Sequence, residues 1–201
     1  MNLPNKLTVI RIICAPVFYT LFLICLQLPD TSRQFYIMLG LLAFWLFLEV
    51  TDVADGYIAR KQGLVSDLGK LMDPFSDVLS RLTFFYCFAM AGIYPFWPLL
   101  IIFWRELSIT FIRAVLAQTG VTLPAGNSGK FKAVFYFMAS MYGMLLCVAI
   151  SAKIIPQNIL PTAVTAGSVL FMLTALVSVL SFVPYFISFI KTDYMQKHIK
   201  E

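Results

Sequence analysis

The chain has little charge for its length. Of its 201 residues only 12% are Asp, Glu, Lys or Arg, whereas 60% are hydrophobic. A soluble domain carries about twice that share of charged residues. The mean hydropathy of +0.85 points the same way. The composition therefore excludes an ordinary soluble protein and predicts an integral membrane protein with a single domain over residues 1–201.

Histidine and paired cysteine are also nearly absent. The single histidine, His198, lies in the polar tail, so a Ser-His-Asp triad and a histidine-ligated metal are both excluded. The four cysteines stand alone in apolar runs without CxxC spacing, at Cys14, Cys25, Cys87 and Cys147. We expect them to be packing residues, not disulfides or metal ligands.

Long apolar runs dominate what is present. Most of them exceed the twenty or so residues that cross a bilayer, and Pro, Gly, Asn and charged residues separate them. We predict an all-α membrane protein with six transmembrane helices, preceded by a short interfacial helix at Asn2–Thr8. The six segments are residues 7–28, 35–59, 70–92, 95–118, 132–152 and 160–190.

The basic residues predict the orientation of these segments. Ten fall on one side of the predicted spans, and only Arg33 and Lys153 fall on the other. Because basic residues collect on the cytoplasmic side, both termini and the loop after the second segment are expected there. The ten are Lys6, Arg11, Arg60, Lys61, Lys70, Lys130, Lys132, Lys191, Lys197 and Lys200.

Four aspartates stand at the ends of two apolar segments. Asp52 and Asp55 are three residues apart, and Asp73 and Asp77 are four apart, so each pair shares one face of a helix. If the two helices pack side by side, four carboxylates converge, and divalent metal is needed to keep them ionised. All-oxygen ligation without His or Cys favours Mg²⁺ or Mn²⁺.

The aspartates belong to a longer pattern, Asp52-x-x-Asp55-Gly56-x-x-Ala59-Arg60 followed by Gly69-x-x-x-Asp73-x-x-x-Asp77. It specifies eight residues over 26 positions. At every one of them the chain resembles the signature of the CDP-alcohol phosphotransferases, membrane enzymes that build phospholipids. The resemblance implies a six-helix bundle, a homodimer, two divalent cations, and transfer of a substituted phosphoryl group from a CDP-linked donor to an alcohol with release of CMP.

The resemblance also implies roles for these residues. Asp52, Asp55, Asp73 and Asp77 would bind the metals, and Asp77 would also be the general base that accepts the proton of the acceptor hydroxyl. Gly56, Ala59 and Gly69 leave room for the nucleotide beside the helix backbone, and Arg60 can pair with the diphosphate. The residues that would bind the CDP-lipid are Asp52, Asp55, Gly56, Ala59, Arg60, Gly69 and Asp73.

A second, basic group of residues lies in the later segments. Arg105 and Arg113 are eight residues apart and face the same way on one helix, and Lys130 and Lys132 begin the next segment. Arginine inside a membrane segment is costly, so two on one stripe predict a bound anion. A phosphorylated acceptor would need such a group beside the metal site.

With the opening Asn2-Leu3-Pro4-Asn5-x-Leu7-Thr8-x-x-Arg11, these basic residues resemble the branch of the family that acts on glycerol 3-phosphate. The reaction implied is CDP-diacylglycerol plus glycerol 3-phosphate giving phosphatidylglycerol phosphate and CMP. The chain departs from the branch in two places. Ala133 follows Lys132 where threonine is usual, and Val78 follows Asp77 where lysine is common. Arg81, on the face of Asp77, is the candidate to replace that charge.

Structural interpretations compete for single residues. Asp73 before Pro74 fits a helix N-cap, and Gly56 and Gly69 fit close helix packing. Arg105 could form a structural pair with Glu49 or Glu106, although adjacent helical residues such as Arg105 and Glu106 do not face each other. Glu49 is a candidate partner of Arg81. None of these interpretations accounts for all four aspartates together.

Two other functions stay open at this point. A sister enzyme would use serine, inositol phosphate or phosphatidylglycerol as the acceptor, and the headgroup charge distinguishes it, since a neutral acceptor does not need four basic residues. A divalent-cation transporter explains the carboxylates, but not Gly56, Ala59, Arg60 and Gly69 at fixed spacing.

Overall fold

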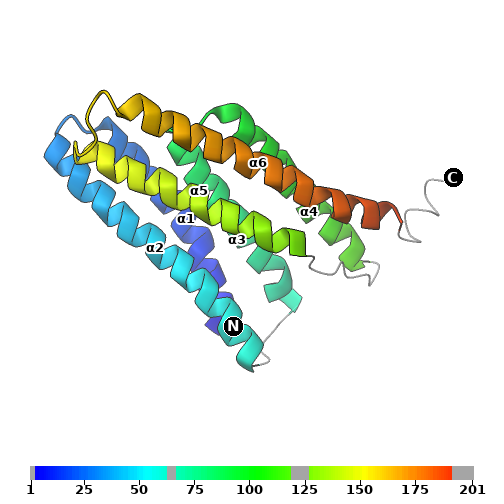
Figure 1. Cartoon of the computed structure of the whole chain (residues 1–201). Coiled ribbons are helices and arrows are strands. Elements are labelled where there is room, and N and C mark those ends of the chain that lie inside the picture. The colour runs from blue at the N-terminus through cyan, green and yellow to red at the C-terminus, as the bar shows by residue number, and fades with distance from the viewer. Residues whose placement is uncertain (1–2, 63–66, 119–126, 192–201) are drawn as a thin grey trace.

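The chain folds into helices joined by short connections (Figure 1). In the computed structural model the backbone is described for residues 3–62, 67–118 and 127–191, and the side chains of residues 3–5, 53, 55–62, 67–71, 117–118 and 127–128 lie outside this description. The described residues form six helices and no strand, which confirms the predicted all-α class. They are α1 Leu3–Gln27, α2 Thr31–Gln62, α3 Asp67–Met90, α4 Phe96–Gln118, α5 Asn127–Ser151 and α6 Leu160–Ile190.

Successive helices run in alternating directions (Figure 1). The start of α1 and the end of α6 lie at the same end of the bundle. The connection from α2 to α3 and the connection from α4 to α5 are at that end too. α1 packs along both α2 and α3, α5 packs along α2, α3 and α6, and α4 packs along α3 and α6. Within the described residues, α2 and α3 thus each pack on α1 more than on each other.

Aromatic rings fill the core between these helices. Phe171 of α6 stacks on Tyr94 with ring centroids 4.4 Å apart and meets Phe85 of α3 edge-on at 5.0 Å. Such pairs contribute about 0.5–1.5 kcal/mol each beyond their buried area. α5 comes close to α3 at Gly143, where a Cβ would lie 2.5 Å from the ring of Phe88. The four cysteines are free and lie buried or half-buried in this packing, as the sequence predicts.

The connection between α3 and α4 is set by a glycine. Gly92 has φ +74°, a conformation that favours glycine. Its N–H donates to the carbonyl of Ala89, and the next N–H, of Ile93, donates to the carbonyl of Phe88. This pair of bonds satisfies the last carbonyls of α3 and ends the helix. The chain then turns back into α4.

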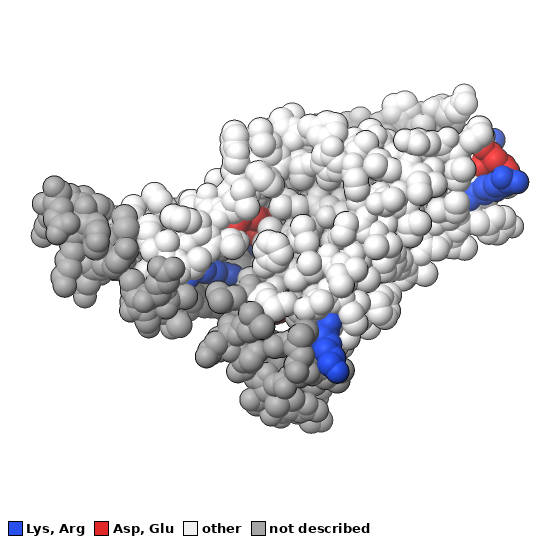
Figure 2. Space-filling model, turned by 180° about the vertical axis from the view of Figure 1, so that it is seen from behind, with Lys and Arg blue, Asp and Glu red and all other residues white. Residues whose placement is uncertain are grey.

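Four of the six helices are long and apolar enough to cross a membrane, namely residues 6–27, 31–52, 129–151 and 160–190. On the face of the molecule shown in Figure 2, the charged groups form a few small, separate patches, and uncharged surface lies between them. These features show a multi-pass membrane protein. α3 and α4 carry charged residues such as Asp77, Arg81 and Arg105 within their length, which lowers their apolar character. Six spans therefore stay a prediction.

One expectation and one competing interpretation about helix ends are wrong. The short separate helix at Asn2–Thr8 does not exist in the described residues, because α1 runs from Leu3 to Gln27 without a break. Pro4 falls in the first turn, where a missing N–H costs no helical hydrogen bond. Asp73 is not an N-cap either, since α3 begins at Asp67 and includes Pro74.

Candidate functional site

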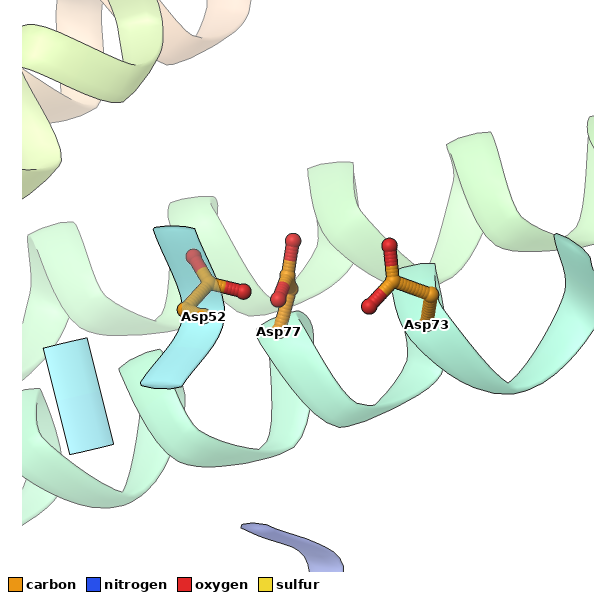
Figure 3. Close-up of side chains that lie close together, drawn as sticks. All are labelled: Asp52, Asp73 and Asp77. Atoms are coloured by element: carbon orange, nitrogen blue, oxygen red, sulfur yellow. The ribbon is translucent and has the colours of Figure 1, made fainter. Parts of the chain in front are cut away.

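Three of the four motif aspartates meet between two helices. Asp52 comes from α2, and Asp73 and Asp77 come from α3, one turn apart (Figure 3). One carboxylate oxygen of each lies within 4.8 Å of the others. Asp77 stands between Asp52 and Asp73, and the carboxylates form a row (Figure 3). The structure therefore brings together Asp52, Asp73 and Asp77, called the carboxylate cluster below.

The remaining residues of the motif lie outside the described side chains. Their backbone positions fall within helices. Three of them, Asp55, Gly56 and Gly69, lie three or four residues along the chain from Asp52 or Asp73. The roles expected of these side chains stay predictions from the sequence. They are Asp55, Gly56, Ala59 and Arg60 of α2 and Gly69 of α3.

A buried arginine of α1 occupies the middle of the carboxylate cluster. The side chain of Arg11 is 2% exposed. Its Nη1 donates to Asp52 and, at 2.7 Å, to Oδ1 of Asp77, and its Nη2 donates to Oδ1 of Asp73 at 2.6 Å. A charge-assisted hydrogen bond is about twice as strong as a neutral one. Arg11 therefore joins α1, α2 and α3 at a single point.

This role of Arg11 is not predicted from the sequence, where Arg11 counts among the basic residues that orient the chain. The expected convergence of the acids supposes that their two helices pack side by side, with no basic residue between them in the motif. The structure places α1 against both helices instead. The signal was present in the arginine's position within a long apolar run, where a charged side chain requires a partner.

A second arginine borders the carboxylate cluster. Nη2 of Arg81 lies 3.6 Å from Oδ2 of Asp52. Arg81 and Glu49 line a small cavity of about 10 Å³ together with Arg11, Asp52 and Asp77. The described carboxylate that pairs with Arg81 is thus Asp52, and Glu49 lies beside that pair.

The chemistry of the carboxylate cluster fits a hard divalent cation. Its donors are all oxygens, and the cluster includes neither histidine nor cysteine. The side chains of Asp52, Asp73 and Asp77 are 22%, 47% and 36% exposed, so water can complete the coordination shell. Mg²⁺ and Mn²⁺ prefer such mixed carboxylate and water ligation.

A larger polar cavity of about 540 Å³ opens beside the carboxylate cluster. Asp73 and Asp77 of α3 contribute to its wall, and Arg81 lies on the same helix. α4 and α5 supply the rest of its charged lining, which is Arg105, Glu106, Arg113, Lys130 and Lys132. The four basic residues singled out in the sequence therefore share one cavity with Asp73 and Asp77.

Arg105 and Lys132 are bound by a buried carboxylate. Nη1 of Arg105 donates to Oε1 of Glu106 at 2.9 Å, and Nζ of Lys132 donates to the same oxygen at 2.8 Å. Arg105 also donates to two serines of α6. The expectation that Glu106 is an awkward partner for its neighbour is wrong, because the long arginine side chain bends back to reach it.

Arg113 and Lys130 are in a different situation. Both residues are exposed, and both line the polar cavity. The guanidinium of Arg113 lies over the ring of Tyr185, 5.7 Å from its centroid. Among the described residues, no carboxylate forms an ion pair with either side chain. Their charges are consequently available to an anion in the cavity.

Comparisons with known proteins identify a family for the sequence. A sequence model of the family described as CDP-alcohol phosphatidyltransferase matches residues 1–183. A Treponema pallidum protein named CDP-diacylglycerol–glycerol-3-phosphate 3-phosphatidyltransferase is 25% identical over 94% of this chain and 89% of its own length. Proteins of the same name from Bacillus subtilis and Rickettsia bellii are 35% and 36% identical, over 65% and 69% of this chain and 70% and 72% of their own lengths.

The position of Arg11 leads to a stability prediction. Replacing Arg11 with Gln leaves three carboxylates within 4.8 Å of one another with one counter-charge fewer. Removing one partner of a fully buried ion pair costs about 3–5 kcal/mol, and because the aspartates are partly exposed we expect about 1–3 kcal/mol here. Unfolding of the purified protein in detergent, without divalent metal, measures this loss.

Arg33→Gln is the matched control. Arg33 forms an exposed pair with Asp30, with side chains 78% and 49% exposed. Such pairs contribute less than about 1 kcal/mol. Equal stability of the two variants would show that Arg11 does not hold the carboxylate cluster together.

Proposed function

The chain belongs to the CDP-alcohol phosphatidyltransferase family, and from this membership we propose that it transfers the phosphatidyl group of CDP-diacylglycerol to glycerol 3-phosphate. The products are phosphatidylglycerol phosphate and CMP. One observation carries the choice of acceptor: Asp73 and Asp77 of the carboxylate cluster line the same cavity as the four basic side chains. The family makes the protein an enzyme of phospholipid biosynthesis, which leaves the divalent-cation transporter without support.

Two divalent cations, Mg²⁺ or Mn²⁺, complete the proposed site. Asp52, Asp55, Asp73 and Asp77 are the residues that would hold them. When bound, such ions neutralise the charge that builds up on the diphosphate during in-line displacement. The convergence of three of these aspartates supports this assignment.

The donor is amphiphilic, and the surroundings of the cavity suit that. An apolar groove of about 1180 Å³ runs between α1, α3 and α4, lined by side chains such as Pro16, Tyr86 and Leu100. Leu82 lines both this groove and the polar cavity. We infer that the CDP-diphosphate contacts the motif while the acyl chains remain in an apolar setting. The motif residues assigned to the CDP-lipid are Asp52, Asp55, Gly56, Ala59, Arg60, Gly69 and Asp73.

The acceptor is bound at the basic part of the cavity. Arg105, Arg113, Lys130 and Lys132 are assigned to its phosphate. The hydroxyl of the acceptor then points toward α3, where Asp77 takes its proton. The freed oxygen attacks the phosphorus that carries the diacylglycerol, a new P–O bond forms, and the P–O bond to CMP breaks. Asp77 suits the role of base because it lines the cavity that holds the acceptor.

The same proposal includes orientation and assembly. We place all six helices across a bacterial-type inner (cytoplasmic) membrane, with both termini and the site on the cytoplasmic side. The ten-to-two distribution of basic residues supports this placement. A homodimer is implied by the family resemblance alone.

The reaction is tested by supplying alternative acceptors. Purified protein in detergent with CDP-diacylglycerol and Mg²⁺ should release CMP with glycerol 3-phosphate and much less with serine, inositol phosphate or phosphatidylglycerol. Omission of divalent metal should abolish release. A preference for one of the other alcohols would assign the chain to a sister enzyme of the family.

Asp77→Asn tests the base. The substitution keeps the shape of the side chain and removes its capacity to accept a proton. Loss of general-base catalysis lowers kcat by about 10²–10⁴-fold, and impaired metal binding would add to that. CDP-diacylglycerol binding should persist. Asp30→Asn, at an exposed acid far from the site, is the isosteric control, and near-normal turnover by Asp77→Asn would remove Asp77 from this role.

Arg113→Gln tests the acceptor site. The change removes a charge that no described carboxylate engages, so the KM for glycerol 3-phosphate should rise about tenfold, the equivalent of one charge-assisted hydrogen bond. The KM for CDP-diacylglycerol should change little. Arg33→Gln, an exposed arginine outside the cavity, should change neither. An equal rise of both constants in Arg113→Gln would contradict the assignment.

A further inference from the structure

Glu106 is a buried acid that none of the assignments above uses. It lies on α4 with its side chain 4% exposed and lines the polar cavity. Three donors converge on one of its oxygens, Oε1. They are Nη1 of Arg105 at 2.9 Å, Nζ of Lys132 at 2.8 Å and the hydroxyl of Tyr136 at 2.8 Å. Two of the four residues assigned to the acceptor phosphate are therefore oriented by a single atom.

The hydrogen bonds continue to α6. The hydroxyl oxygen of Tyr136 lies 2.7 Å from Oγ of Ser178. Because the tyrosine has one proton and gives it to Glu106, Ser178 is the donor in this pair. Nη2 of Arg105 donates to Oγ of Ser181 at 2.8 Å, and that hydroxyl donates to the carbonyl of Ser178 at 2.7 Å. The network thus links α4, α5 and α6 on one wall of the cavity.

Charge balance explains why such a network needs an acid. Arg105 is 5% exposed and Lys132 20% exposed, so two cations are held in largely dry surroundings. Uncompensated buried charge is costly, and a carboxylate between two cations offsets most of that cost. The group keeps one net positive charge, which faces the cavity together with Arg113 and Lys130.

We propose that Glu106 is a positioning residue for the phosphorylated acceptor, acting through Arg105 and Lys132. By binding both on Oε1, it keeps their remaining N–H donors directed along the cavity wall at a fixed spacing. Tyr136 holds Glu106 in turn, and Ser178 ties the tyrosine to α6. The proposal rests on the proposed function, because it concerns the acceptor of that reaction.

A purely electrostatic role leads to the opposite expectation. If Glu106 only reduced the positive charge of the cavity, its removal would strengthen binding of a phosphate dianion. If it positions Arg105 and Lys132, its removal weakens binding even though the cavity becomes more positive. The sign of the change therefore separates the two roles.

The experiment measures acceptor binding and turnover for Glu106→Gln, Glu106→Asp and Tyr136→Phe. Binding of glycerol 3-phosphate to the detergent-solubilised protein is followed by calorimetry, and CMP release gives both KM values. In Glu106→Gln the Kd and KM for glycerol 3-phosphate should rise about tenfold or more, as expected for loss of hydrogen bonds to a charged group. The KM for CDP-diacylglycerol should change less than about threefold, which is no more than the loss of one weak neutral hydrogen bond would cause.

The other two variants give the graded result that positioning requires. Glu106→Asp keeps the charge on a shorter side chain and should recover part of the affinity. Tyr136→Phe removes one of the three donors and should weaken acceptor binding about two- to fivefold, as for a single hydrogen bond. Tyr136→Phe also serves if Glu106→Gln fails to fold. Ser108→Ala is the matched control on α4, since within the described part of the chain its hydroxyl donates to the carbonyl of Trp104 and to no residue of the network.

The outcomes separate this inference from the proposed function. Tighter or unchanged acceptor binding in Glu106→Gln, or an equal loss for both substrates, overturns positioning while the wild-type reaction stands. If the wild-type protein binds glycerol 3-phosphate but releases no CMP, the proposed reaction fails and the binding series still decides the role of Glu106. If it turns over only acceptors without phosphate, both proposals fail.

Discussion

The gathering of carboxylates around one buried guanidinium is the interaction on which the rest of this structure depends. Asp52, Asp73 and Asp77 come from two helices that each pack on α1, and Arg11 of α1 contacts all three. Like charges at this distance repel strongly where the surroundings are partly dry. A fixed counter-charge from a third helix lets the acids stay close before any ligand arrives. The cluster then remains open to solvent on one side, where further positive charge can bind.

The basic wall of the cavity repeats this arrangement with the signs reversed. There, one buried carboxylate, Glu106, lies between the cations of Arg105 and Lys132. Each wall thus carries a central group of opposite sign that offsets part of its charge and keeps part of it for a ligand. A donor diphosphate with metal suits the first wall, and an acceptor phosphate suits the second. Because Asp73 and Asp77 of the first group line the same cavity as the basic wall, the two substrates can meet there with the reacting atoms between them.

The helices and part of the carboxylate cluster could be predicted from the sequence, because both follow from the local spacing of residues along the chain. The six helices follow from apolar runs, and the pairing of Asp73 with Asp77 follows from four-residue spacing. What could not be predicted depends on which helices are neighbours. Arg11 and Asp52 are 41 residues apart, and nothing in their local patterns shows that α1 packs against both acid-bearing helices. The pair of Arg105 with Glu106 is one of the alternatives that the sequence offers, but it looks unfavourable there for a different reason. The rule for adjacent helical residues describes Cβ directions and not the reach of a long side chain.

The charged residues of the site also interrupt the apolar sequences of α3 and α4. A helix whose polar groups faced lipid would be unstable in a membrane, because each unpaired group costs several kcal/mol. α3 avoids this by packing against α1, α4 and α5. All three cover it with aromatic rings, and α1 supplies Arg11 as the partner of its acids. α4 turns Arg105 and Glu106 toward α5 and α6 for the same reason. The four strongly apolar helices therefore do more than anchor the chain, since they supply the packing that lets two helices carry charge within the bundle.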